Sequence, residues 1–131
     1  VITQYLKLVS NGGSLVPTPL LSVAADLYMD EAHVADIRAY YHANFALVER
    51  HLGISPPQGG FFLWLKVDDD VHFVKRLMAE QAVRALPGSF MGVETVEGNP
   101  GAGYVRLALV HDAKTTDEAL RRIAKIYEGH G

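Results

Sequence analysis

The chain has 131 residues, of which 49% are hydrophobic and 21% charged, as expected of one ordinary globular domain with a single core. Its 12 basic and 15 acidic residues give a formal net charge of −3, which argues against nucleic acid or an anionic membrane as a partner. The sequence contains no cysteine, which excludes disulfides, thiolate metal sites and thiol catalysis and is compatible with a cytoplasmic protein. We expect residues 1–131 to form one domain.

The first part of the chain predicts two short helices joined by a loop. Residues 2–9 follow a helical pattern, and because the sequence starts there without a methionine we expect a piece of a longer protein. Residues 10–14 are rich in Gly, Asn and Ser and predict a turn-rich loop. Thr18 as N-cap and Pro19 at the first helical position predict a second helix that ends near Met29. Both helices are expected to expose apolar surface, through which the chain self-associates.

A long third helix is predicted over residues 31–52. Asp30 is expected to cap its N-terminus, and Gly53 follows it at the position that favours a left-handed backbone. Its apolar side chains recur at spacings of three and four residues. These side chains are Val34, Ile37, Tyr41, Phe45, Val48 and Leu52. Residues 56–60, with two prolines and two glycines, end the helical region.

The second half of the chain predicts a small sheet with helices. Residues 61–67 are rich in aromatic side chains and predict a strand that is covered on both faces. The aspartates 68–70 open a helix that runs to about Gln81. A second strand is predicted over 83–86, and a long Gly-rich loop follows over 87–103. The buried side of the helix is expected to carry Val71, Val74, Leu77 and Met78.

A third strand and a last helix complete the predicted fold. The strand lies within residues 103–110, and Thr115 with Glu118 forms a capping box for the helix. The helix is expected to pack Leu120, Ile123 and Tyr127 inward. Three helices, a strand, a helix, two strands and a helix predict an α/β or α+β layer, in which helices cover a sheet of about three strands.

Arg106 stands in the middle of the apolar run 103–110 and is the main candidate for function. Burying a guanidinium among Val, Leu and Ala costs several kcal/mol unless an anion meets it. The residue therefore predicts a clamp for a carboxylate or a phosphate. The alternative is an arginine on the solvated face of a half-buried strand.

Three other patterns have a structural explanation. Residues 30–33 spell the DEAH box of helicases, but the chain lacks the phosphate-binding loop, and acidic residues suit a helix N-terminus. The aspartates 68–70 lack the spacing of a calcium loop. His33, His42 and His51 recur every nine residues, which turns a helix by about 180° per step, so they do not face one metal.

Four segments of the chain, in this order and spacing, resemble the carboxy-terminal part of class I/II pyridoxal-phosphate aminotransferases. Together they cover essentially the whole chain, and their sequences are most similar to those of succinyldiaminopimelate and aspartate aminotransferases. The segments are DEAHV at 30–34, PQGGFFLWL at 57–65, LPGSFMG at 86–92 and GYVRLAL at 103–109. The resemblance implies the small domain of a fold type I enzyme, preceded by interdomain helices.

The resemblance also implies roles for individual residues. Arg106 matches the arginine that forms a bidentate pair with the α-carboxylate of the amino-acid or 2-oxo-acid substrate. Residues 60–62, with Phe61 as the predicted site residue, would bring apolar surface to the same site. Ser10 and Asn11 resemble a loop that, in the homodimers of the family, reaches toward the neighbouring subunit's pocket.

The chain departs from the family where the cofactor is bound. The Schiff-base lysine, the partner of the pyridine nitrogen and the phosphate-binding residues lie upstream in these enzymes. None of the lysines matches them; these are Lys7, Lys66, Lys75, Lys114 and Lys125. We expect the chain alone neither to bind pyridoxal phosphate nor to transaminate, whereas the longer parent protein does both. The competing hypothesis is a stand-alone, non-catalytic ligand-binding or dimerisation module.

Overall fold

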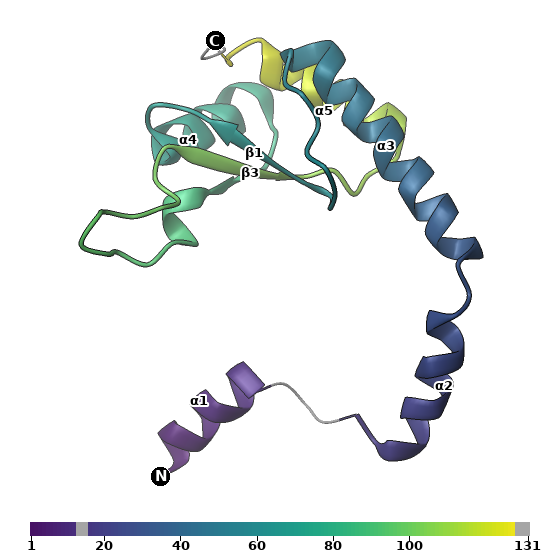
Figure 1. Cartoon of the computed structure of the whole chain (residues 1–131). Helices are drawn as coiled ribbons and strands as arrows, with labels where there is room; N and C mark the ends of the chain where they lie inside the picture. The colour runs from purple at the N-terminus through teal and green to yellow at the C-terminus, as the bar shows by residue number, and fades with distance from the viewer. Residues whose placement is uncertain (13–15, 128–131) are drawn as a thin grey trace. The chain divides into compact units, whose positions relative to one another are not determined.

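The computed structural model describes residues 1–12 and 16–127, and the chain divides into two compact units, Val1–Asp36 and Ile37–Gly131. The first contains two helices, α1 (Ile2–Gly12) and α2 (Thr18–Tyr28). A third helix, α3 (Ala32–Leu52), begins in the first unit and ends in the second (Figure 1). The prediction that residues 1–131 form one domain stays a prediction.

Helices α1 and α2 bury none of their residues within the described chain, which confirms the expected exposed apolar surface. The large apolar and aromatic side chains that they expose are Ile2, Tyr5, Leu6, Leu8, Val9, Leu20, Leu21, Val23, Leu27 and Tyr28. Self-association through this surface stays a prediction.

The loop predicted from residue 10 begins too early. Ser10 and Asn11 belong to α1, because the Ser10 Oγ and the Asn11 Nδ2 both donate to the Lys7 carbonyl, at 3.0 and 2.8 Å, and so extend the helical hydrogen bonding. Gly12 is the last residue of the helix. The rest of the predicted loop, residues 13 and 14, lies outside the described residues.

The predicted starts of α2 and α3 are each one residue off, whereas the predicted Asp30 cap of α3 is confirmed. Pro17 is the N-cap of α2, with no side-chain cap, and Thr18 is already helical. The Asp30 Oδ1 accepts from the Ala32 amide at 3.0 Å, as a capping carboxylate does. Gly53, at φ 66°, ends α3 in the left-handed conformation that glycine adopts without strain.

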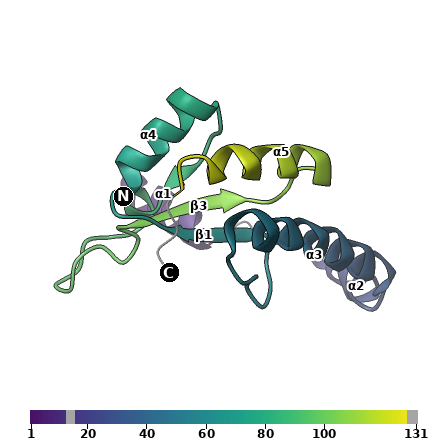
Figure 2. The ribbon, with the colours of Figure 1, turned by 90° about the horizontal axis from the view of Figure 1, so that it is seen from above.

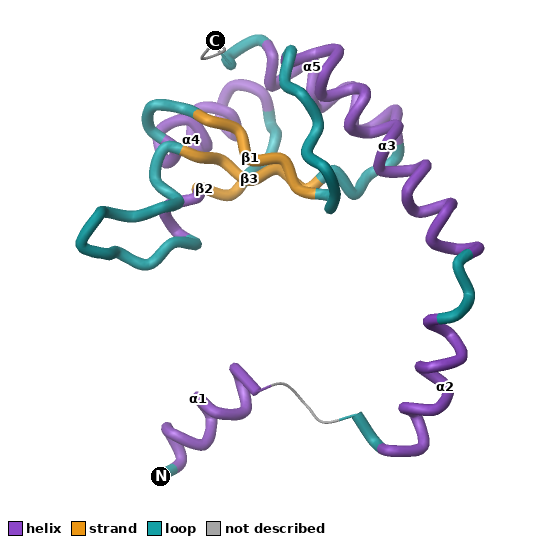
Figure 3. The backbone as a smooth tube through the Cα atoms, in the orientation of Figure 1, coloured by secondary structure: helices purple, strands orange, loops and turns teal. Residues whose placement is uncertain are grey.

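The second unit contains a three-stranded antiparallel sheet in the order β1-β3-β2. The strands are β1 (Phe62–Lys66), β2 (Leu86–Pro87) and β3 (Tyr104–Ala108). The strand expected over 83–86 is therefore only two residues long and shifted, and Figure 3 shows it as a short segment beside β3. Pro87 is tolerated because β2 is an edge strand. The predicted α/β fold with a small sheet is confirmed.

Helices α4 (Asp70–Gln81) and α5 (Ala113–Ala124) lie on one face of this sheet (Figure 2). The second half of α3 adds Phe45 and Val48 to the same core. The remaining core side chains are Leu63, Leu65, Val67, Phe73, Leu77, Val105, Leu107, Leu109, Leu120 and Ile123. Because side chains alternate along a strand, the other face carries the remaining residues of β1 and β3.

Three predictions about this unit are wrong. Strand β1 is covered on one face only, since Trp64 is 44% exposed between the buried Leu63 and Leu65. Met78 is on the exposed side of α4, and Phe73 fills the core instead. Asp112 caps α5 in place of a capping box, because the Thr115 amide donates to its Oδ1 at 3.0 Å.

Candidate functional site

Arg106 lies on the sheet face opposite the core. Its chain neighbours Val105 and Leu107 are buried, so alternation turns Arg106 the other way, where it is half-buried. The register pairs it with Trp64 on β1 and with Leu86 on β2. The guanidinium is therefore not buried among Val, Leu and Ala, because Val105 and Leu107 point into the core and Ala108 is exposed on the face of Arg106. The arginine lies on the central strand, on a face that also carries Phe62, Trp64 and Tyr104.

The guanidinium of Arg106 stacks on an aromatic ring. Its Cζ lies 4.4 Å from the centroid of the Phe62 ring, which is a cation–π contact. Within residues 37–127 it takes part in no hydrogen bond or ion pair. A ring covers a face of the planar group and leaves the in-plane N–H donors free. Arg106 can therefore bind a carboxylate or a phosphate edge-on, through two parallel hydrogen bonds.

Phe62 is the last ring of a chain of aromatic contacts that we call the aromatic ladder (Tyr40, Tyr41, Phe61 and Phe62). Phe61 lies 4.3 Å from Phe62 between ring centroids and stacks on Tyr41 at 5.6 Å. Tyr41 meets Tyr40 edge-on at 5.4 Å, and the Tyr40 hydroxyl donates to the Val110 carbonyl at 3.2 Å. The ladder thus joins α3 to the guanidinium.

Phe61, predicted to contribute apolar surface to the site, is one ring away from Arg106. The residue in contact is Phe62, which belongs to the same predicted segment 60–62, and Trp64 is the cross-strand neighbour. The pairing of β1 with β3 decides which of two consecutive phenylalanines faces the arginine. The available signal was the two-residue period that puts Phe62 and Trp64 on one face.

The turn after β2 closes against the same face. Residues Gly88–Phe90 form a short 3₁₀ helix. The backbone of Gly88 lies close to its neighbours, since a Cβ there would be 2.7 Å from the Tyr104 carbonyl oxygen and 3.0 Å from the Trp64 ring. The Trp64 and Tyr104 rings meet edge-on at 6.4 Å. Glycine is required at residue 88 because a side chain there would overlap the backbone carbonyl oxygens of Gly101 and Tyr104.

A buried carboxylate holds this turn. Asp70, only 6% exposed at the start of α4, accepts from the Ser89 amide at 2.8 Å. Asn99 donates to the Ser89 carbonyl and accepts from the Gly101 amide, both at 2.9 Å. Burial raises the pKa of Asp70, but its hydrogen bonding to Ser89 outweighs burial, so the pKa lies below its usual value. Asp70 is thus an anion that fixes the loop.

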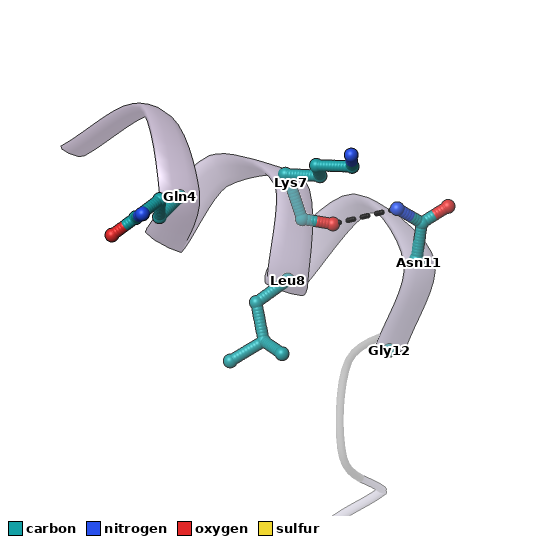
Figure 4. Close-up of a pocket in the computed structure, with 5 residues that line it drawn as sticks. All are labelled: Gln4, Lys7, Leu8, Asn11 and Gly12. Atoms are coloured by element: carbon teal, nitrogen blue, oxygen red, sulfur yellow. Dashed lines mark hydrogen bonds between the residues drawn. The ribbon is translucent and has the colours of Figure 1, made fainter. Parts of the chain in front are cut away.

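Ser10 and Asn11, the other predicted site residues, lie on α1 in the first unit, whereas Arg106 belongs to the second. Figure 4 shows a shallow hollow on this helix, with the Asn11 amide bonded to the Lys7 carbonyl and the Leu8 side chain on the other side. All the lining residues come from α1. Their proposed role in a pocket is a prediction that α1 by itself does not test.

The chain's lysines do not fit the Schiff base of pyridoxal phosphate. A lysine that forms such an adduct is activated by desolvation in a pocket or by a neighbouring cation. All five lysines of this chain are exposed. Lys66 shares the face of Arg106 but lies at the exposed end of β1, opposite Tyr104. We therefore derive no reaction step through this cofactor from the residues present.

Comparison with known proteins agrees with the fold. Residues 1–123 match the sequence profile of the family described as aminotransferase class I and II. An aminotransferase from Neisseria meningitidis Z2491 superposes with a TM-score of 0.76 at 33% identity, over 97% of this chain and 34% of that one. Aspartate aminotransferase from Thermotoga maritima superposes with a TM-score of 0.62 at 30% identity, over 91% of this chain and 31% of that one.

Sequence relatives point to the same class. LL-diaminopimelate aminotransferase from Nitratidesulfovibrio vulgaris strain DP4 is 34% identical over 73 residues, 53% of this chain and 17% of that one. The enzyme of the same name from Syntrophobacter fumaroxidans is 29% identical over 105 residues, 74% of this chain and 26% of that one. The chain thus spans only about a sixth to a third of the relatives it matches.

The fold and its matches define a small α/β domain of a fold type I transferase. The chain belongs to the aminotransferase class I and II family. The finer prediction of a succinyldiaminopimelate subgroup stays a prediction. Across the described residues, no helix combines the length and the apolar character needed to cross a membrane.

Proposed function

We propose that residues 37–127 form the substrate-carboxylate-binding part of a pyridoxal-phosphate-dependent aminotransferase, and that Arg106 binds the α-carboxylate of its amino-acid and 2-oxo-acid substrates. The observation that carries the proposal is the unpaired, half-buried guanidinium of Arg106 on an aromatic face, in a chain of the aminotransferase family. A ring contact does not neutralise the guanidinium, so its full positive charge can attract a ligand.

The proposed role follows from the shape of the two groups. A carboxylate meets a guanidinium in one plane through two parallel N–H···O bonds, which fix its direction as well as its position. Trp64 and Phe62 flank Arg106 with apolar surface and keep water from part of the guanidinium. Partial removal of water strengthens the charge pair, and the fixed direction orients the rest of the substrate for reaction.

The other roles in this proposal belong to the longer protein. We propose that the cofactor is held by residues beyond this chain, that the chain alone is inactive, and that the enzyme is a cytoplasmic homodimer. In that homodimer Ser10 and Asn11 would reach the neighbouring subunit's pocket. The exposed apolar helices α1 and α2 support an interface in this region. The sequences and names of the relatives support the substrate class.

The test uses the full-length protein with Arg106→Ala and Arg106→Lys, and kcat/KM is measured with its best amino donor. Losing two charge-assisted hydrogen bonds of about 1.5–3 kcal/mol each lowers kcat/KM by at least about 100-fold, and lysine restores only part of it because it lacks the planar fork. Arg84→Ala is the matched control, since Arg84 is exposed and precedes β2. An Arg106→Ala enzyme as active as the Arg84→Ala enzyme would overturn the proposal.

A further inference from the structure

We propose that Phe62 is a positioning residue that holds the Arg106 guanidinium in its carboxylate-binding orientation, and that the aromatic ladder fixes the Phe62 ring for this purpose. The inference rests on the proposed function, because it assumes that Arg106 binds the substrate carboxylate. It adds a residue that acts through Arg106 and itself bonds no substrate.

The first step is the placement of the two residues on the sheet. Phe62 pairs with Ala108, so it is the diagonal cross-strand neighbour of Arg106 on the open face. Diagonal neighbours are about 7–8 Å apart at the backbone, a span that a long side chain crosses. The arginine therefore leans along its strand to put its Cζ 4.4 Å from the centre of the ring. This direction distinguishes Phe62 from Trp64, which lies directly opposite.

The second step is the cost of holding an arginine still. A free arginine side chain has about 2 kcal/mol of rotamer entropy to lose when a ligand orders it. A ring that already holds the guanidinium removes part of that loss before the carboxylate arrives. Among residues 37–127, Phe62 supplies the one aromatic stacking contact to the guanidinium.

The third step is the choice of an aromatic ring over an acid. A carboxylate beside Arg106 would also hold it, but it would occupy the N–H donors and neutralise the charge that the substrate needs. The face of a phenylalanine attracts a cation through its quadrupole and takes none of the in-plane donors. Stacking thus positions the guanidinium and leaves it available.

The fourth step is what holds the ring. The Phe61 ring lies 4.3 Å from that of Phe62, and Phe61 stacks on Tyr41 at an interplanar angle of 26°. The Leu109 amide donates to the Phe61 carbonyl at 2.9 Å, which fixes the backbone beside the ring. The position of Phe62 is thus set by β3 on one side and by α3 on the other.

The experiment replaces Phe62 in the full-length protein by leucine, by tyrosine, and by phenylalanines with one, two and three ring fluorines. The inhibition constant of propionate, a carboxylate without an amino group, is measured together with KM and kcat for the best amino donor. Fluorine weakens the quadrupole and changes the size of the ring little. Fluorinated phenylalanine at residue 73, in the core on the other face, is the matched control.

We expect Phe62→Leu to raise the propionate inhibition constant and KM about 5-fold with a smaller change in kcat, and Phe62→Tyr to stay within about twofold of the native enzyme. The inhibition constant rises stepwise with each fluorine at residue 62 and stays native with fluorine at residue 73. In an Arg106→Ala background the fluorine series has no effect, because there is no cation to attract.

A flat fluorine series in the native background would overturn the inference, even where Phe62→Leu fails to fold. If the series is flat while Arg106→Ala still loses kcat/KM, the proposed function stands and only the role of Phe62 falls. If Arg106→Ala keeps its kcat/KM, both the proposed function and this inference are overturned.

Discussion

The His51 Nε2 lies 2.7 Å from the Asp117 Oδ1 and joins the last turn of α3 to α5. The hydrogen bond from His51 is the main cause that holds the pKa of Asp117 below its usual value, and the nearby Arg121 adds to it. Because α3 also carries two rings of the aromatic ladder, this pair helps to anchor the helix from which the ladder starts.

The pair predicts a loss of local stability in acid. The pKa of Asp117 is lower in the folded than in the unfolded chain, so its contribution is present above the unfolded value and disappears as the pH falls through the lowered folded value. We expect Asp117→Asn to speed amide exchange in the last turn of α3 and in α5 near pH 7, and to flatten the acid dependence. Hydrogen exchange of the full-length protein, corrected for intrinsic rates, measures this.

Glu94→Gln is the control for that experiment, since Glu94 is an exposed carboxylate in the loop after β2. We expect this change to leave the amide exchange rates in α3 and α5 at their native values. Equal exchange in the Asp117→Asn and native proteins at every pH would show that the pair adds nothing to stability.

The buried Asp70 predicts a second effect, on the loop that closes against Trp64. Asp70→Asn removes the charge from the bond to the Ser89 amide. We expect a destabilisation of about 1–3 kcal/mol, together with faster exchange of the Ser89 amide. The pKa of Asp70 is lowered in the folded state, so the native protein loses the same contribution as the pH falls through that value. Glu94→Gln, at an exposed carboxylate in the loop after β2, is the comparison variant.

The close approach of two backbone segments gives a third prediction. A Cβ on Gly101 would overlap the Gly88 carbonyl, so Gly101→Ala forces the turn away from the Trp64 ring. We expect this change to destabilise the protein by about 1–3 kcal/mol and to raise KM. A Cβ on Gly59 meets nothing within 4 Å, so we expect Gly59→Ala to leave the stability and KM near their native values. A lowered melting temperature confined to Gly101→Ala confirms the overlap.

Much of the fold follows from local sequence, and the errors have a common cause. The order of helices and strands, the end of α3 at Gly53 and the strand around Arg106 are set by period, caps and glycine, which act over a few residues. Residues 10–12 have the composition of a turn but continue α1, where the Ser10 and Asn11 side chains donate to the Lys7 carbonyl. Local sequence preference is compatible with either a turn or a helix there, and the side-chain hydrogen bonds to the Lys7 carbonyl favour the helix.

The candidate site contains one residue that local sequence predicts and others that it does not. Arg106 stands out because a charge interrupts an apolar run, and this signal needs no knowledge of the fold. Within the predicted segment 60–62, the contact of Phe62 with Arg106 could not be predicted, because it depends on the pairing of β1 with β3 across more than 40 residues of chain. The same long-range pairing puts Trp64 on the open face although its segment reads as fully buried.

The last prediction concerns the end of β3, which a buried amide holds to α3. Asn44 is 1% exposed, and its Nδ2 donates to the Leu109 and His111 carbonyls, each at 2.9 Å. Asn44→Ala leaves two carbonyl groups without this donor, so we expect a destabilisation of about 1–3 kcal/mol, measured by calorimetry of the full-length protein. His42→Ala, an exposed change on the same helix, is the control. If Asn44→Ala unfolds at the temperature of His42→Ala, the amide does not anchor the strand that carries Arg106.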